Sequence, residues 1–257
     1  MSDLSGKFGL VLGVANKRSI SWAIAQAAAR AGARLALTYP SERLEENVRD
    51  LAGTLADAVV LPCDVTTDEQ IAALTGALDS EFGGLDFVVH GAAYAPAAEL
   101  ANSFVQTSRE GFRTALDVSA FSLVALTAAC VPLMEKRGGG SVVTLSHIGS
   151  ERVFPHYNVM GVAKAALEAS VRYLAADLGP RNIRVNAISA GPIKTLAAAG
   201  IPGLSAMLQA QRERAPLRRG MELGEIADAA VFLLSNASRA ITGEVLLVDG
   251  GYHVAGI

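Results

Sequence analysis

Tyr157 and Lys164 stand seven residues apart in the segment PHYNVMGVAKAALEASVRYLAADLG, and their types and spacing suit proton donation. Seven residues make nearly two turns of an α-helix, so the two side chains leave the same face, about 20° apart. A phenol and an ammonium that share one cavity can act as a proton donor and its electrostatic support. For an isolated pair, the alternative is a half-buried tyrosine and a surface lysine on an amphipathic helix.

A second chemical feature lies near the N-terminus, where an apolar run ends at Gly13 and a polar loop leads to Ser19. The fingerprint G-x-G-x-x-G is absent, because the next glycine after Gly13 is Gly32. The order strand, glycine turn and helix start nevertheless suits a pyrophosphate, which the positive end of a helix attracts. We expect Ser19 to cap this helix. A capped helix without any ligand remains the alternative.

The end of the second expected strand bears on the choice of dinucleotide. Residues 38–41 (TYPS) contain no acid that could grip an adenosine ribose and no base that could meet a 2′-phosphate. Because no basic residue stands at 38–41, the sequence favours NADH over NADPH. Arg43 is the nearest residue that could contact a 2′-phosphate. Asp64 and Val65 follow the third strand and can flank an adenine, although Asp64 also suits an Asx turn or helix cap.

Composition excludes several classes of function. Of 257 residues, 51% are hydrophobic and 18% charged, and the formal net charge is −3, so nucleic-acid binding is not expected. We expect no membrane span and no signal peptide, and therefore a cytoplasmic protein. Cys63 and Cys130 suit buried positions rather than a disulfide framework. The spacing of the cysteines and the four histidines matches no metal motif, so no metal is predicted.

The elements that must position these residues alternate along the chain. Apolar runs predict strands at 8–14, 34–39, 58–65, 85–93, 141–147, 183–189 and 243–251. Helical patterns lie between them, including one over about 109–135 and one from Tyr157 to about Gly179. Repeated β-α-β units predict an α/β fold: a doubly wound, Rossmann-type parallel sheet of about seven strands with helices on both faces. We expect a single domain over 1–257.

In such a sheet, ligands bind beyond the carboxyl ends of the strands. The loops at 13–20, 38–43, 63–66, 90–96, 146–157 and 190–205 should therefore share one rim. The segment at about 195–220 reads as a substrate-loop insertion, rich in Ala, Gly, Leu and Met, with few polar anchors before Arg212. It suits a mobile lid, and a simple surface helical hairpin is the alternative.

Three features occur together: the Tyr-x6-Lys helix, the turn Gly13-x5-Ser19-Ile20, and the run ISAGPIKTLA at 188–197. In this combination the chain resembles the enoyl-[acyl-carrier-protein] reductases of bacterial type II fatty acid synthesis, which are divergent short-chain dehydrogenases/reductases. The resemblance covers essentially the whole chain, down to the closing segment 243–251. Ordinary members of the superfamily carry Tyr-x3-Lys, whereas Met160 stands four residues before Lys164.

The resemblance implies NADH-dependent reduction of the trans-2 double bond of enoyl thioesters, with acyl carrier protein as partner and a homotetrameric assembly. It implies that Tyr157 hydrogen-bonds the thioester carbonyl oxygen, that Lys164 holds the nicotinamide ribose, and that Ala95 contacts substrate. The implied cofactor contacts are Gly13, Ala15, Ser19, Ile20, Asp64, Val65, Ala92, Lys164, Ile193, Lys194, Thr195, Leu196 and Ala197. A basic cluster, Arg212, Arg214, Arg218 and Arg219, suits docking of an acidic carrier protein, and a solvated basic face is the alternative.

The chain departs from the family at one central position. His147 stands ten residues before Tyr157, where the family usually has a second tyrosine, so we count it with the catalytic candidates. It either replaces that tyrosine as a donor or lines the acyl pocket. Two rival functions stay open: an ordinary short-chain carbonyl reductase or alcohol dehydrogenase, and a non-catalytic nucleotide-binding homologue. The Tyr-x6-Lys spacing argues against the first, and retention of the 186–197 segment argues against the second.

Overall fold

The protein is built around one parallel β-sheet of seven strands. Its structure is a computed structural model that describes residues 2–195, 198 and 203–255. The strands run in the order β3-β2-β1-β4-β5-β6-β7, and every neighbouring pair is parallel. They are β1 (Phe8–Val11), β2 (Arg34–Tyr39), β3 (Val59–Pro62), β4 (Phe87–His90), β5 (Gly140–Ser146), β6 (Ile183–Ala190) and β7 (Val245–Val248). The predicted Rossmann-type fold is confirmed.

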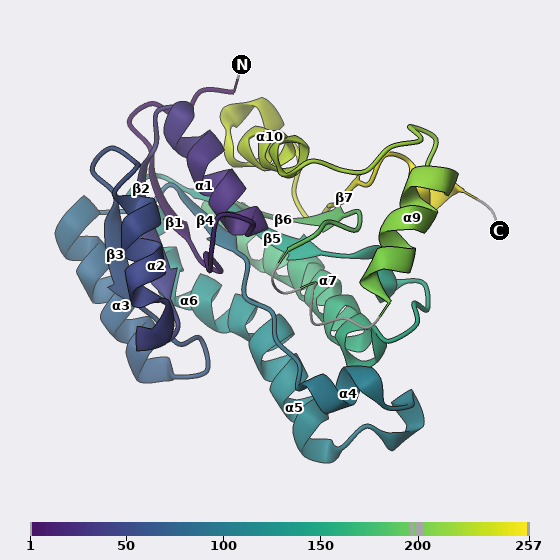
Figure 1. Cartoon of the computed structure of the whole chain (residues 1–257). Helices are drawn as coiled ribbons and strands as arrows, with labels where there is room; N and C mark the ends of the chain where they lie inside the picture. The colour runs from purple at the N-terminus through teal and green to yellow at the C-terminus, as the bar shows by residue number, and fades with distance from the viewer. Residues whose placement is uncertain (1, 196–197, 199–202, 256–257) are drawn as a thin grey trace.

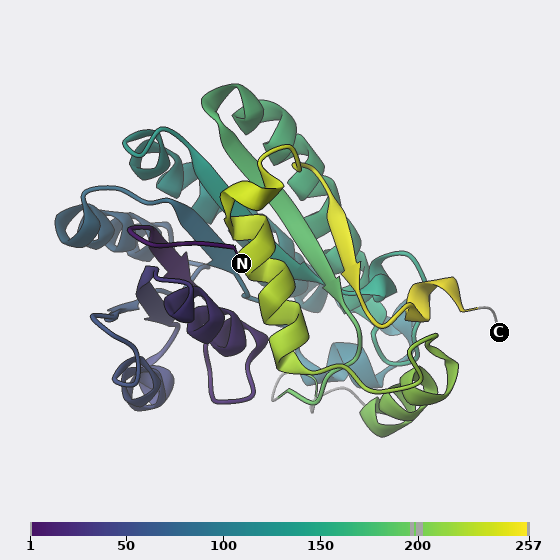
Figure 2. The ribbon, with the colours of Figure 1, turned by 90° about the horizontal axis from the view of Figure 1, so that it is seen from above.

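Helices cover both faces of this sheet (Figures 1 and 2). One face packs against α1 (Ile20–Arg30), α2 (Glu42–Ala52) and α10 (Leu223–Leu234), and the other packs against α3 (Asp68–Phe82), α6 (Ser122–Glu135) and α7 (Asn158–Leu178). Side chains alternate along the strands: Val11 and Leu37 face the first layer, while Leu10 and Ala36 face the second. Because both faces are buried, the strands read as continuous apolar runs in the sequence.

One long helix bears on the expectation that the chain has no membrane span. Residues Arg109–Glu135 form α5 (Arg109–Leu116), a π-helical turn (Asp117–Phe121) and α6 without a break, close to the predicted 109–135. An 18-residue window in it has a mean hydropathy of 1.8, so this helix is long and apolar enough to cross a membrane by length and composition alone. Half of the window is buried, and Leu123, Leu126 and Cys130 pack in the core. These contacts are those of a core helix.

The segment at about 195–220 contains α9 (Leu204–Arg214), which stands over the carboxyl edge of the sheet (Figure 1). One polar side chain anchors this segment directly before Arg212. Gln211 is fully buried, and its Nε2 donates to the backbone oxygen of Asp249 at 3.2 Å. This contact ties the last turn of α9 to the residue that follows β7.

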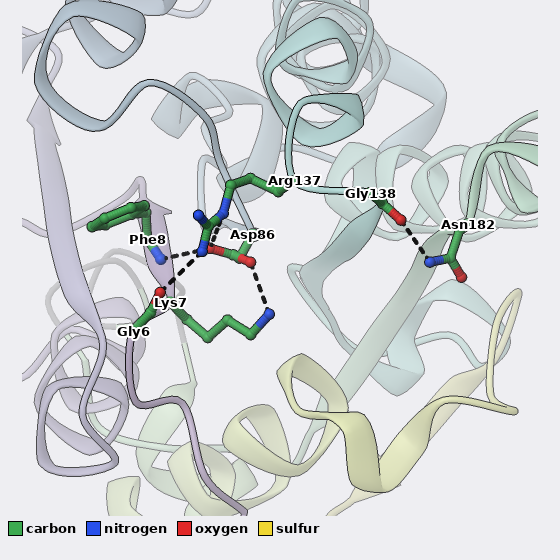
Figure 3. A network of polar contacts seen from close by, with 7 residues as sticks. All are labelled: Gly6, Lys7, Phe8, Asp86, Arg137, Gly138 and Asn182. Carbon is green, nitrogen blue, oxygen red and sulfur yellow. Dashed lines mark hydrogen bonds and ion pairs between the residues drawn. The ribbon is translucent and has the colours of Figure 1, made fainter.

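A buried carboxylate forms a polar network at the amino ends of the strands (Figure 3). Asp86, directly before β4, accepts hydrogen bonds from Lys7 Nζ (2.9 Å), Phe8 N (2.9 Å) and Arg137 Nε (3.1 Å). Arg137 also donates to the backbone oxygen of Gly6 at 3.0 Å. The network joins the start of β1, the start of β4 and the turn after α6, and it lies at the amino ends of the strands, away from the ligand-binding edge.

We predict that Asp86→Asn lowers the free energy of unfolding by about 2–3 kcal/mol, because two cations and a backbone N–H lose their buried anion. The matched control is Asp79→Asn, which breaks an exposed ion pair with Lys136 and should cost less than about 1 kcal/mol. Urea unfolding of the three proteins measures the difference. Equal losses in the two variants would contradict the structural role given to Asp86.

Candidate active site

A cleft of about 620 Å³ opens beyond the carboxyl ends of β1, β4, β5 and β6. It lies where the chain order reverses between β1 and β4, the place where open α/β sheets bind ligands. Residues from the loops at 13–20, 90–96, 146–157 and 190–205 line it, so these predicted rim loops do meet. The predicted site residues that line the cleft are Gly13, Ala15, Ser19, Ile20, Ala95, His147, Tyr157, Lys164, Ile193 and Thr195.

The other predicted site residues are placed differently. Asp64, Val65, Ala92 and Lys194 do not line the cleft, and Leu196 and Ala197 lie outside the described residues. The Asp64 carboxylate accepts from Thr66 N at 3.0 Å and from Thr66 Oγ1 at 2.8 Å, which is the Asx turn named as its alternative. Within the described residues, no group of three His, Cys, Asp or Glu side chains is arranged to hold a metal ion.

The loop between β1 and α1 forms one end of the cleft. Gly13 has φ +86°, and a Cβ at this position would lie 2.4 Å from the backbone oxygen of Gly91. Only glycine therefore lets this turn lie against the end of β4. Arg43, the basic residue nearest to the end of β2, also lines the cleft.

The prediction that the Ser19 side chain caps α1 with a hydrogen bond is wrong. Ser19 is the N-cap residue of α1, but its Oγ accepts from the backbone N–H groups of Ala15 and Asn16, both at 3.0 Å, and not from the helix. The Ser19 hydroxyl thus closes the loop that precedes α1. The first turn of α1, described in full, contains no acidic residue. Its positive end is therefore free to attract an anion.

Tyr157 and Lys164 form the other end. Tyr157 is the N-cap of α7 (φ −87°, ψ −33°), and Asn158 after it has φ +40°, so the predicted regular helical spacing to Lys164 does not extend through this first turn. Both side chains line the cleft, yet only 7% of Tyr157 and 5% of Lys164 is exposed, which excludes the surface-lysine alternative. Lys164 Nζ donates to the backbone oxygen of Leu145 at 2.7 Å.

The electrostatics of this pair follow from burial. Burial raises the pKa of the Tyr157 phenol, and the negative charge of Glu168 raises it further, so the phenol keeps its proton at neutral pH. Burial lowers the pKa of Lys164 to about 8, while Glu168 opposes that shift. Near pH 7 the cleft thus contains a neutral hydroxyl donor and an ammonium.

His147 lies against Tyr157, with 4.8 Å between the ring centroids. Its Nδ1 accepts a hydrogen bond from the backbone N–H of Gly149 at 2.9 Å, so a neutral imidazole carries its proton on Nε2. Burial, and secondarily the charge of Lys164, lowers the pKa of His147 to about 4. At neutral pH the ring is therefore an uncharged N–H donor.

Sequence reasoning missed several residues of the site. Glu168 is buried and accepts a short hydrogen bond from Ser146 Oγ. The signal was present, because Glu168 stands four residues after Lys164 and so shares its helix face. Gly149 and Gly161 bring η3 (Ile148–Ser150) and α7 together, since a Cβ at position 161 would lie 2.7 Å from the oxygen of Gly149. Leu100, Met160, Leu204 and Met207 give the cleft an apolar wall.

Comparison with known proteins gives a consistent result. The profile of the family described as "Enoyl-(Acyl carrier protein) reductase" matches residues 13–253. The enoyl-[acyl-carrier-protein] reductase [NADH] FabI of Aquifex aeolicus is 49% identical over 100% of this chain and 95% of its own length. That of Bacillus subtilis is 51% identical over 98% of both.

Solved structures agree with the sequence relatives. The Bacillus cereus enoyl-acyl carrier protein reductase, solved with NADP+ and indole naphthyridinone, superposes with a TM-score of 0.97 at 51% identity over 100% of both chains. The Anaplasma phagocytophilum reductase in complex with NAD superposes with a TM-score of 0.95 at 46% identity, over 100% of this chain and 98% of that one.

We predict that Gly149→Ala displaces the Tyr157 ring and lowers the free energy of unfolding by about 1–3 kcal/mol, as overpacking does. The added Cβ would lie 2.4 Å from Tyr157 Cδ1 and 3.0 Å from His147 Nδ1. Gly179→Ala is the matched control, because a Cβ there meets nothing within 4 Å. Urea unfolding and a crystal structure of each variant are the measurements. A Gly149→Ala protein with an unmoved ring would contradict the contact.

Proposed function

The chain belongs to the family of enoyl-[acyl-carrier-protein] reductases, and we propose that it reduces the trans-2 double bond of enoyl thioesters with the site around Tyr157 and Lys164. It is an NADH-dependent oxidoreductase of fatty acid biosynthesis. The observation that carries the assignment of roles is the burial of a phenol and an ammonium on one face of α7, both open to the same cleft.

The residues at the other end of the cleft fit a dinucleotide. The Gly13 turn has no room for a side chain, the Ser19 hydroxyl closes the loop, and the start of α1 carries no acid that would repel a pyrophosphate. Arg43 lines the same cleft and is the basic side chain available to a 2′-phosphate, so NADPH is the second cofactor in this proposal. When bound, NADH supplies the hydride that is added to the β-carbon of the enoyl chain.

Tyr157 stabilises the charge that develops on the substrate. As the β-carbon gains hydride, negative charge builds on the thioester oxygen, and the Tyr157 hydroxyl donates a hydrogen bond to that oxygen. One such donor in a buried site contributes about 3 kcal/mol to lowering the barrier. Because burial raises its pKa, the phenol stays protonated and remains a donor throughout. A proton then enters at the α-carbon and completes the saturation.

Lys164 binds and orients the cofactor ribose. One of its three N–H bonds is directed to the Leu145 oxygen, which leaves two for ribose hydroxyls. Its charge also raises the positive potential beside Tyr157, where the thioester oxygen becomes negative. The protein thereby positions donor and acceptor, and orientation of this kind supplies much of the rate enhancement.

His147 serves as the second donor of the site, in the place where the family usually has a tyrosine. Its proton is held on Nε2 by the Gly149 contact, and its low pKa keeps the ring neutral at the pH where Tyr157 works. A neutral imidazole also adds no second positive charge that would repel the Lys164 ammonium, which holds the ribose.

The partner of the enzyme is an acyl carrier protein that presents the enoyl chain, and the apolar wall of the cleft suits that chain. The exposed Arg212, Arg214 and Arg218 support its docking, whereas Arg219 is already paired with Glu225. We place the protein in the cytoplasm, as one domain per chain within a homotetramer. Exposed Phe112, Phe121 and Tyr173 supply apolar surface for contacts between subunits.

We predict that Tyr157→Phe lowers kcat by about 100-fold to 1,000-fold while NADH binding is largely retained, because the lost donor acts on the substrate oxygen. Lys164→Ala should weaken NADH binding about tenfold or more, because charge-assisted hydrogen bonds are lost. NADH oxidation with crotonyl thioester and NADH fluorescence titration measure the two effects. Acetoacetyl thioester tests the carbonyl-reductase alternative. Equal loss of binding and turnover in both variants would sink these roles.

We also predict that His147→Phe lowers kcat/KM for crotonyl thioester about tenfold, the effect of one lost hydrogen bond in the transition state. His147→Tyr restores a donor and should keep most of the activity. Both variants should bind NADH like the wild type. An active His147→Phe enzyme with unchanged kcat/KM would assign His147 to the wall of the acyl pocket instead.

A further inference from the structure

The face of α7 that carries Tyr157 and Lys164 continues for one more turn to Glu168, and this face lies along the end of β5. Lys164 Nζ donates to the oxygen of Leu145, and one turn later Glu168 accepts from the hydroxyl of Ser146. Two side chains spaced by one turn of α7 therefore hold two consecutive residues of the strand. The third residue in this series, His147, contacts Tyr157.

Glu168 is buried as deeply as the lysine, with 6% of its surface exposed. A buried ammonium is costly unless an opposite charge compensates it, and otherwise it loses its proton. The titratable groups around Lys164 are Tyr157 and Glu168 on α7, His147 after β5 and His90 at the end of β4. Of these four, the two imidazoles and the phenol are neutral at pH 7, so Glu168 provides the negative charge.

We propose that Glu168 is the buried counter-charge that keeps the Lys164 side chain an ammonium, and that Ser146 fixes the carboxylate in that position. Glu168 is thus a positioning residue, since it acts through Lys164 and does not itself line the cleft. The inference rests on the proposed role of Lys164 in holding NADH. It explains why an acid occupies the inward face of α7 among Leu167, Val171 and Ala175.

Other physical features agree with this assignment. Burial lowers the pKa of Lys164 to about 8, and Glu168 is the group that opposes the shift. Lys164 therefore sits close to losing its proton within the working pH range. Removal of the Glu168 carboxylate lowers the pKa of Lys164 further, by about one unit, because a negative charge one helix turn away favours the charged form.

The test is the pH dependence of NADH affinity in Glu168→Gln, measured by fluorescence titration between pH 6 and 9.5. The wild type should lose affinity with an apparent pKa near 8, and the variant about one unit lower, so that at pH 8 it binds NADH about fivefold more weakly. At pH 6 the two should bind alike. A Glu168→Gln profile that coincides with the wild-type profile overturns the proposal.

Glu99→Gln is the matched control. Glu99 is also a buried glutamate, 8% exposed, and its Oε1 accepts from a serine hydroxyl, that of Ser108 at 2.5 Å. Its NADH profile should coincide with that of the wild type. Ser146→Ala removes the hydrogen bond but leaves the charge, and it should shift the apparent pKa by less than half of the Glu168→Gln shift. An equal shift would show that geometry and not charge governs Lys164, and would overturn the proposal.

A second measurement does not depend on Glu168→Gln folding well. If the carboxylate compensates the ammonium, removing the lysine as well should recover stability. Lys164→Met combined with Glu168→Gln should unfold at a higher urea concentration than Glu168→Gln alone, and a double variant that is no more stable contradicts the proposal. Crotonyl thioester reduction by the wild type separates the two claims. If the wild type does not reduce crotonyl thioester but Glu168→Gln still shifts the pH profile of NADH affinity, the proposed function is refuted. The proposal that Glu168 is the counter-charge of Lys164 then still holds.

Discussion

The site depends on the close approach of α7 to η3, the turn that follows β5. That approach requires two glycines, because a Cβ at Gly161 would lie 2.7 Å from the oxygen of Gly149 and one at Gly149 would lie 2.4 Å from Tyr157 Cδ1. With the backbones this close, side chains from successive turns of α7 reach successive residues of the strand end. Tyr157 then lies against His147, and Lys164 reaches the backbone of β5. The packing of these glycines thus sets the positions of Tyr157, His147 and Lys164 in the site.

Burial at this contact gives each group its protonation state. One water-poor pocket keeps the phenol of Tyr157 protonated, keeps His147 neutral and brings the pKa of Lys164 down to about 8. The carboxylate of Glu168 favours the charged form of Lys164, whereas burial outweighs the charge of Asp249 at His147. A neutral donor and a cation can therefore lie side by side at the same pH, which is what stabilisation of a developing negative oxygen requires.

Much of this arrangement could be predicted from the sequence, because it depends on local periodicity. Seven apolar runs gave the seven strands, and the spacing of Tyr157 and Lys164 gave one shared face. The rest depends on contacts between distant segments. Ser19 was expected to cap its helix, yet its hydroxyl accepts from two backbone N–H groups of the preceding loop. The network of Asp86 and the anchor at Gln211 join residues far apart in the chain, so no local pattern announces them.

The central claim is that the buried phenol on α7 meets the thioester oxygen of the substrate. A crystal structure of the protein with bound NADH and a saturated or slowly reacting acyl thioester tests it most directly. We expect Tyr157 Oη within hydrogen-bond distance of the thioester carbonyl oxygen, about 2.6–3.2 Å, with the Lys164 Nζ on the ribose. A closed complex in which that hydroxyl points away from the carbonyl, beyond such a distance, would contradict the account.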